Sequence, residues 1–426
     1  MENILLKYFD DQIENPDYRK IKQQGFGKSI KSWISNGERY INVNNEILKI
    51  TSCKTFHDFL FYFFEYKFDK NWLKDPKNIN HPLSIWYHIK NEFISKQQVN
   101  TQGYYNAPCT GAIMALLRLS YNLYLLAHNV ELQNSLIKRL KQVEQFQGAY
   151  YETYVASYLI YSGFKIEIED ESNGSKKHHD YIAIAKETGI KYAVEVKLCS
   201  RKNILGAAAG NDSFKSVGDH LHGALSKPTE DKRIIFIELN TGKNNWFKEV
   251  NEILNQKELT LTVNRNPAPS AYLFLTNTNY HYHEHDTGYS INNIFTGFKI
   301  DDFHIEPKTY EQIIENEINH IDCIELFTDI QNFEIPSTFN GENPNIEFSS
   351  NKINGVIEEV QNHQENIGPK SPLEMYNFYF QSYRNATKEK LLEFIDTKKL
   401  YPVLESFSQE RLAKLYCRLL SFYGRF

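Results

Sequence analysis

The sequence has few cysteines and no long apolar run. Its five cysteines are widely spaced, odd in number and never in a Cys-x-x-Cys arrangement (Cys53, Cys109, Cys199, Cys323, Cys417). This usage predicts reduced thiols rather than a disulfide framework or a zinc site. No segment approaches the roughly 20 consecutive apolar residues that a membrane span requires, and residues 1–4 lack the start of a signal peptide. We therefore expect a cytoplasmic protein that does not contact membranes.

Other features are also absent. There is no Gly-rich loop ending in Gly-Lys-Ser/Thr, so this chain is not expected to hydrolyse ATP by itself. No internal repeat is recognisable. The chain also lacks excess positive charge: its net charge is −5, which argues against a protein that coats nucleic acid non-specifically. The 426 residues, 41% hydrophobic and 24% charged, are typical of a soluble globular protein with two or three domains.

The most informative segment is residues 178–197, which contain two apolar strands joined by a tight turn. Asp180 precedes the first strand, and Glu195-Val196-Lys197 ends the second. Because strand side chains alternate between faces, Glu195 and Lys197 lie on one face and Val196 on the other. A short turn centred on residues 187–188 would place Asp180 opposite Glu195 and His178 opposite Lys197. A slip of one residue would move Asp180 to the other face.

This grouping has the chemistry of metal-dependent phosphodiester cleavage. Two carboxylates, Asp180 and Glu195, can hold a hard metal ion, and the Lys197 ammonium can act on the attacking water or the developing charge. The chain contains other acid-x-Lys triplets, two of which have proline in the middle, which a central strand does not accept. The alternative is a solvated hairpin whose charges have no catalytic role.

The neighbouring segments extend the pattern. Residues 148–160 are typical of a helix, ended by a Ser-Gly pair, and residues 164–169 alternate as a strand does. A second helix is predicted at 214–226 and an apolar strand at 233–239. The resulting order is helix, three strands, helix, strand.

This order, with these residues, resembles the PD-(D/E)xK (restriction-endonuclease-like) nuclease superfamily over about residues 146–240, with an extension to Asn277. Asp180 matches the first acid of the motif, Glu195 the second and Lys197 the lysine. Glu152 matches an acid often found on the first helix. His179 stands where many members have proline. The resemblance implies an α/β core, a mixed sheet flanked by helices, and Mg²⁺-dependent hydrolysis of nucleic acid.

The resemblance also implies roles for individual residues. Asp180, Glu195 and the backbone carbonyl of Val196 would hold Mg²⁺, for which Mn²⁺ can substitute. Lys197 would orient or deprotonate the attacking water, or stabilise the transition-state charge. Glu152 would ligate a second ion or fix a metal-bound water. The alternative for Glu152 is an exposed carboxylate in the first turn of its helix, where it would stabilise the N-terminus.

Basic residues around the hairpin predict a rim that follows phosphates. The candidates for nucleic-acid binding are Lys177, His179, Arg201, Lys202 and Lys227. The alternative is that these turns are simply polar and solvated. A further cluster, His281, His283 and His285, follows an apolar strand at 271–276. Three histidines at alternate strand positions would suit Zn²⁺, whereas a polar loop at the end of a strand is the alternative.

The flanks are predicted to be helical. Apolar and aromatic periodicity predicts helices at 56–64, 82–94, 108–128 and 131–143, and later at 353–363, 373–384, 388–394 and 410–422. The segment 335–352 is rich in Asn, Pro, Ser and Gly and is typical of a linker. The expected organisation is a helical N-terminal domain (1–145), a nuclease-like domain (146–334), the linker (335–352) and a helical C-terminal region (353–426).

The sequence thus predicts a Mg²⁺-dependent endonuclease, with DNA favoured over RNA, of the kind found in bacterial restriction or anti-phage defence. Two alternatives stay open: a non-catalytic nucleic-acid-binding or assembly subunit on the same fold, and an RNase toxin. Homodimerisation or pairing with a partner subunit would use the helical flanks.

Overall fold

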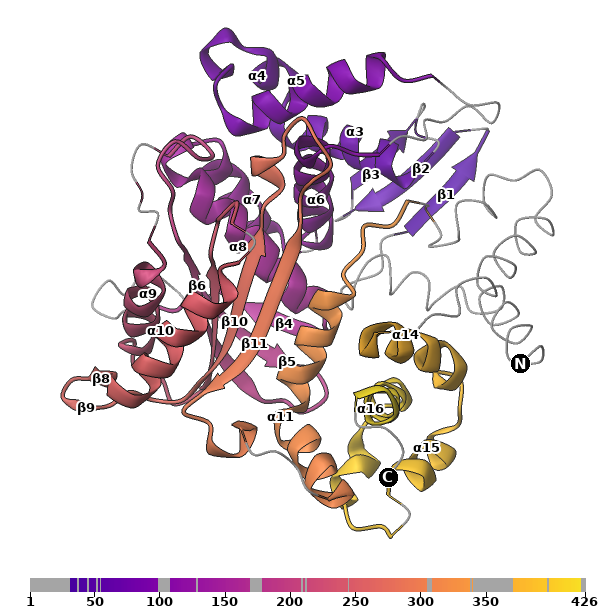
Figure 1. Ribbon diagram of the computed structural model, residues 1–426. Helices are drawn as coiled ribbons and strands as arrows, with labels where there is room; N and C mark the ends of the chain where they lie inside the picture. Colours follow the sequence, from indigo (N-terminus) through magenta and orange to yellow (C-terminus); the bar gives the residue numbers. More distant parts are fainter. Residues whose placement is uncertain are drawn as a thin grey trace.

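The computed structural model describes residues 31–36, 38–43, 46–50, 53, 55–98, 108–127, 129–168, 178–207, 210, 213–243, 245–304, 309–337, 339, 371–396 and 398–422. Within them, helices surround a central sheet, and a smaller helical group lies at the C-terminal end of the chain (Figure 1). The predicted α/β class, with a mixed sheet flanked by helices, is confirmed.

The central sheet has six strands in the order β11-β10-β7-β6-β5-β4. Their bounds are β4 Phe164–Glu167, β5 Tyr181–Ala185, β6 Lys191–Leu198, β7 Lys232–Glu238, β10 Ala271–Thr278 and β11 Ile291–Phe298. Strands β6, β7 and β10 run parallel to one another, whereas β4, β5 and β11 pair antiparallel with their neighbours. The carboxyl ends of the three parallel strands therefore meet at one edge of the sheet.

The β5–β6 hairpin has the register that the sequence predicts. Tyr181 pairs with Val194, and the following pairs continue without a bulge. Asp180, directly before β5, donates its backbone N–H to the Val194 carbonyl at 3.2 Å. The turn ends at Gly189, whose φ of 69° lies in the left-handed region that glycine adopts at little cost. Asp180 and Glu195 consequently lie opposite each other.

Each face of the sheet is covered by its own helices. On one face, Val194 and Phe236 share a core with α6 (Gly111–Leu125), α8 (Val143–Tyr161) and α11 (Tyr310–Gln331). On the other face, Ile235 and Ile237 pack with α9 (Lys215–Leu225) and α10 (Phe247–Thr260). Alternation along β6 therefore sends Glu195 and Lys197 to the α9 face and Leu198 to the α8 face.

Helix α6 is apolar on all sides and almost wholly buried, as expected of a helix surrounded by other elements. Its first residue, Gly111, donates its N–H to the carbonyls of His283 and Asp286 at 2.8 and 3.0 Å. A Cβ atom at Gly111 would collide with the Tyr280 and His283 carbonyl oxygens. The close approach of the loop after β10 to this helix start therefore requires glycine.

The N-terminal segment differs from its prediction as a separate helical domain. Helices α3 (Phe56–Phe68), α4 (Lys70–Lys74), α5 (Pro82–Ser95) and α7 (Val130–Leu140) are present, but so is an antiparallel sheet of β1 (Lys31–Ser35), β2 (Glu38–Val43) and β3 (Glu46–Ile50). The expected boundary at residue 145 falls inside α8, which begins at Val143. Phe56 of α3 and Ile41 of β2 belong to the same hydrophobic core as Val194. This region and the large sheet therefore share one core.

Helices α14 (Pro372–Tyr383), α15 (Lys388–Ile395) and α16 (Gln409–Phe422) agree with the predictions for the C-terminal region. They form a smaller core with the first half of α11. The helix predicted at 353–363 lies outside the described residues, as does most of the predicted linker. Short elements complete the chain: β8 Thr262–Val263, β9 Asn266–Pro267, and the 3₁₀ helices η1 Pro76–Asn78, η2 Tyr280–Tyr282, η3 Asp301–His304 and η4 Pro402–Ser406.

Buried ion pairs attach α16 to the rest of the molecule. Arg411 of α16 contacts Asp322 and Glu325 of α11, each at 2.9 Å, and all three side chains are buried. Asp322 also accepts a hydrogen bond from Thr188 in the β5–β6 turn at 2.6 Å. The C-terminal region is thereby linked to the turn of the hairpin that carries Asp180 and Glu195.

Candidate active site

Glu195 is the centre of a charged cluster at one end of β6. Its side chain is 2% exposed, and three cationic or ionisable groups surround it. Oε1 lies 2.9 Å from His179 Nδ1 and 2.6 Å from Lys227 Nζ, and Oε2 lies 2.6 Å from Lys197 Nζ. Burial acts to raise the pKa of Glu195, but the hydrogen bonds from His179, Lys197 and Lys227 outweigh it and the pKa is lowered. The carboxylate is therefore held in its ionised form.

Asp180 faces Glu195 across the hairpin. Its Oδ2 accepts the backbone N–H of Val196 at 2.7 Å and lies 3.9 Å from Lys197 Nζ. The pKa of Asp180 is raised, first by burial and then by the negative charge of Glu195. Two carboxylates this close repel each other unless a cation lies near both.

In this structure the Lys197 ammonium is that cation, since it contacts Glu195 and approaches Asp180. Among the described residues, no group of three or more His, Cys, Asp or Glu side chains is arranged to hold a metal ion. Mg²⁺, however, often takes only one or two carboxylates from a protein and keeps several waters. The two carboxylates fit Mg²⁺ in donor chemistry, and Lys197 marks the place between them as one that attracts positive charge.

Glu152 lies well inside α8 because the helix begins at Val143, so the alternative that placed it in the first turn is wrong. Its carboxylate forms a bidentate pair with Arg139 of α7, at 2.5 and 2.6 Å. The charge of Glu152 contributes to the raised pKa of Asp180, which places the two carboxylates within electrostatic reach. Arg139 was not found by sequence reasoning: it lies on another helix, and no motif connects it to Glu152.

Two members of the predicted basic rim are buried and are corrected here. His179 is occupied by Glu195 and approaches the Pro228 carbonyl at 3.4 Å. Arg201 is 3% exposed and donates to the Leu239 and Asn240 carbonyls, each at 3.1 Å. A side chain that is buried and bonded to the protein does not reach a phosphate, so both stabilise the fold around the site.

The other predicted rim residues differ from one another. Lys227 is partly buried and directed at Glu195, with a further bond to the His178 carbonyl at 2.5 Å. Lys202 is exposed. Lys177 lies outside the described residues. Lys227 is thus the one predicted rim residue that the described structure brings into contact with the candidate catalytic residues by an ammonium–carboxylate pair.

The three histidines after β10 do not share a strand face, contrary to the arrangement considered for Zn²⁺. His281 lies on η2 and its Nε2 is 2.7 Å from Asn240 Oδ1. His283 instead pairs with Asp286 at 2.8 Å. Their partners differ because the chain leaves the sheet at Thr278, so the strand periodicity on which the zinc reading depended ends before the cluster.

Comparisons with protein-family models, with curated proteins and with solved structures give no match for this chain. In the part of the chain that the structure describes, none of the helices combines the length and apolar character needed to cross a bilayer. The geometry at the end of β6 is therefore the main ground on which a function can be argued.

Proposed function

We propose that this chain is a Mg²⁺-dependent nuclease of the PD-(D/E)xK type, with DNA as the favoured substrate and Mn²⁺ as an alternative ion. The observation that carries the proposal is the opposition of Asp180 and Glu195 across the hairpin, with Lys197 on the Glu195 face and near both. A solvated hairpin with incidental charges would not bury two facing carboxylates, because each pays a desolvation penalty.

In this proposal Asp180, Glu195 and the Val196 carbonyl hold Mg²⁺, which when bound polarises the scissile phosphate and a water molecule. His179 and Lys227 keep Glu195 ionised and fix its orientation through Oε1. Lys197 would leave Oε2 as the carboxylate charge is neutralised, and its ammonium would then lie beside the attacking water. Glu152, already paired with Arg139, would orient a water from the α8 side.

The runner-up is a non-catalytic nucleic-acid-binding or assembly subunit, and one observation favours it. Both oxygens of Glu195 are engaged by cationic groups and the side chain is almost inaccessible, so the cluster could be an internal ion-pair network. The two proposals differ in metal affinity: a network that serves only stability has no reason to bind Mn²⁺. The restriction or anti-phage setting, the choice between DNA and RNA, and a homodimer or partner subunit remain parts of the proposal for experiment.

The test is cleavage of plasmid DNA, single-stranded DNA and RNA with Mg²⁺ or Mn²⁺, comparing wild type with Asp180→Asn and Lys197→Ala. Asp301→Asn and Lys191→Ala are matched controls, since both residues are exposed and lie away from the cluster. Metal-dependent cutting that the two site variants abolish and the controls retain is expected. Equal cutting by all forms would refute the assignment.

If no form cuts, calorimetric titration with Mn²⁺ separates the two proposals. Binding by wild type that Asp180→Asn loses would support a metal-dependent enzyme whose substrate or trigger was missing from the assay. No binding by either form would favour the non-catalytic subunit.

A further inference from the structure

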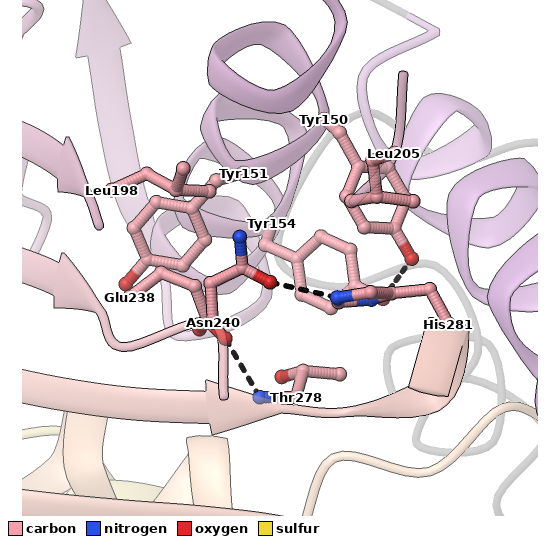
Figure 2. A pocket seen from close by; sticks show the side chains of 9 residues that line it. All are labelled: Tyr150, Tyr151, Tyr154, Leu198, Leu205, Glu238, Asn240, Thr278 and His281. Atoms are coloured by element: carbon pink, nitrogen blue, oxygen red, sulfur yellow. Dashed lines mark hydrogen bonds between the residues drawn. The ribbon is translucent and has the colours of Figure 1, made fainter. Parts of the chain in front are cut away.

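A narrow pocket lies at the carboxyl ends of β6, β7 and β10, on the α8 face of the sheet (Figure 2). It encloses about 270 Å³, including the part that is open to solvent. Its lining combines aromatic, apolar and polar side chains: Tyr150, Tyr151, Tyr154, Leu198, Leu205, Glu238, Asn240, Thr278 and His281. The carboxyl ends of parallel strands are where open α/β sheets commonly bind ligands.

The pocket adjoins the Asp180–Glu195 cluster through two pairs of consecutive residues. Leu198 lines the pocket, while Lys197 before it points to the other face of β6 and contacts Glu195. Tyr151 lines the pocket, while Glu152 after it lies within electrostatic reach of Asp180. Pocket and cluster therefore flank the same end of β6, about one or two residue lengths apart along the chain.

The polar lining presents hydrogen-bond acceptors. His281 Nε2 donates to Asn240 Oδ1, because the Asn240 amide nitrogen is directed at the Cys199 carbonyl. His281 Nδ1 is then an acceptor, and it is buried without a partner among the described residues. Burial lowers the pKa of His281 to about 3, so the ring stays neutral. The Glu238 carboxylate adds two more acceptor oxygens to the same lining.

This chemistry restricts the guest. An anion is disfavoured by Glu238, and a purely apolar group would leave the His281 acceptor unsatisfied. A tightly held metal ion would need more ligating side chains than the described residues bring together. The volume is below the roughly 300–1,000 Å³ of sites for drug-sized ligands. A flat, single-ring heterocycle with N–H donors, placed against the tyrosines, satisfies all these conditions, and a pyrimidine base is such a group.

Resting on the proposed nuclease function, we propose that this pocket takes one unstacked pyrimidine base of the nucleic acid whose backbone crosses the Asp180–Glu195 cluster. The base donates N–H groups to His281 Nδ1 and Glu238 and lies against the tyrosines of α8. A base within a duplex is paired and stacked and is not free to enter. The substrate class is therefore single-stranded or locally unpaired nucleic acid.

The test measures binding of full-length protein to fluorescent oligonucleotides in EDTA, so that cutting does not interfere. The strands are a single-stranded pyrimidine oligomer, the same strand with abasic sites, and its duplex. Wild type is expected to bind the pyrimidine strand at least about fivefold more tightly than the abasic strand, the lower end of what one stacked base contributes. His281→Phe, which keeps a ring but removes the acceptor, should lose this preference and leave abasic-strand affinity unchanged.

His88→Phe is the matched control, since His88 is exposed and remote from the pocket lining. Glu238→Gln is a second pocket variant of unchanged shape, in case His281→Phe does not fold, and it should also weaken the base preference. Equal wild-type affinity for pyrimidine and abasic strands would overturn the proposal, as would an equal loss for both strands in the pocket variants.

The failure of this inference is distinguishable from failure of the nuclease proposal. Metal-dependent cutting without any base preference in binding would reject the pocket alone. Base-dependent binding that His281→Phe removes, in a protein that neither cuts nor binds Mn²⁺, would reject the nuclease and retain the pocket.

Discussion

Replacing Glu238 with glutamine should stabilise the protein at neutral and alkaline pH. Glu238 is 4% exposed, and its carboxylate accepts hydrogen bonds from the Thr278 backbone N–H and the Thr276 hydroxyl. No salt bridge to Glu238 occurs among the described residues. Burial therefore prevails over these hydrogen bonds and raises its pKa to about 7.

The magnitude follows from the difference between the folded and unfolded pKa values. Glu238 ionises near 4.5 in the unfolded chain and near 7 in the folded protein, and one pKa unit corresponds to about 1.36 kcal/mol. As pH rises from 4.5 to 7, the unfolded chain loses its proton first and folding stability falls. Above pH 7 the full cost, roughly 3 kcal/mol, is present. Glutamine does not ionise and avoids it.

The hydrogen bonds around Glu238 survive the change. The glutamine carbonyl can accept the Thr278 N–H, and its amide can donate to Thr276 Oγ1. Thr276 can then donate to Tyr151, whose hydroxyl lies 2.8 Å away in a contact that either atom can donate. The chain of hydrogen bonds thus reverses direction without losing a member.

Urea unfolding followed by tryptophan fluorescence, at pH 5 and pH 8, measures the effect. Glu238→Gln should exceed wild type by roughly 3 kcal/mol at pH 8 and by much less at pH 5. Glu249→Gln, at an exposed position of α10, should show no such pH-dependent gain. A variant whose difference from wild type is equal at both pH values would refute the reasoning.

Three further changes have defined outcomes. Asp180→Asn should raise the melting temperature near neutral pH, because the ionised carboxyl with its raised pKa is a cost there, while metal-dependent cutting is lost; an unchanged or lower melting temperature would contradict this. Arg411→Met should cost about 3–5 kcal/mol in urea unfolding, since it leaves two buried carboxylates of α11 unpaired, whereas Lys398→Met, in an exposed pair, should cost under about 1 kcal/mol. Gly111→Ala should lower the melting temperature through its collision with backbone carbonyls, whereas Gly223→Ala, in open space on α9, should leave it unchanged or raise it; equal effects would refute the packing argument.

Local patterns in the sequence were sufficient for the hairpin and for most helices. Alternating apolar residues and a short turn determine both the faces and the register of β5 and β6, because side-chain direction in a strand has a period of two. The opposition of Asp180 and Glu195 follows from that register alone. Helices α3, α5, α14 and α16 are likewise readable from their own periodicity and caps.

Local patterns were insufficient where the boundary of an element had no local signal. Helix α8 begins at Val143 without a side-chain cap hydrogen bond, so its start was placed too late and Glu152 was assigned to the wrong turn. The sheet of β1, β2 and β3 was missed in a segment that was read as helical. Both belong to a core shared with the large sheet, and packing of this kind overrides weak local preference.

The tertiary structure alone decided which charges meet. Glu195 is held by Lys227 from beyond α9, and Glu152 is paired with Arg139 from α7. Arg201, which follows the catalytic strand and appears basic and exposed in the sequence, is instead buried against backbone carbonyls. Charge has no periodicity along the chain that reveals its partner. Its role depends on distance and burial in three dimensions, and only the folded chain sets these.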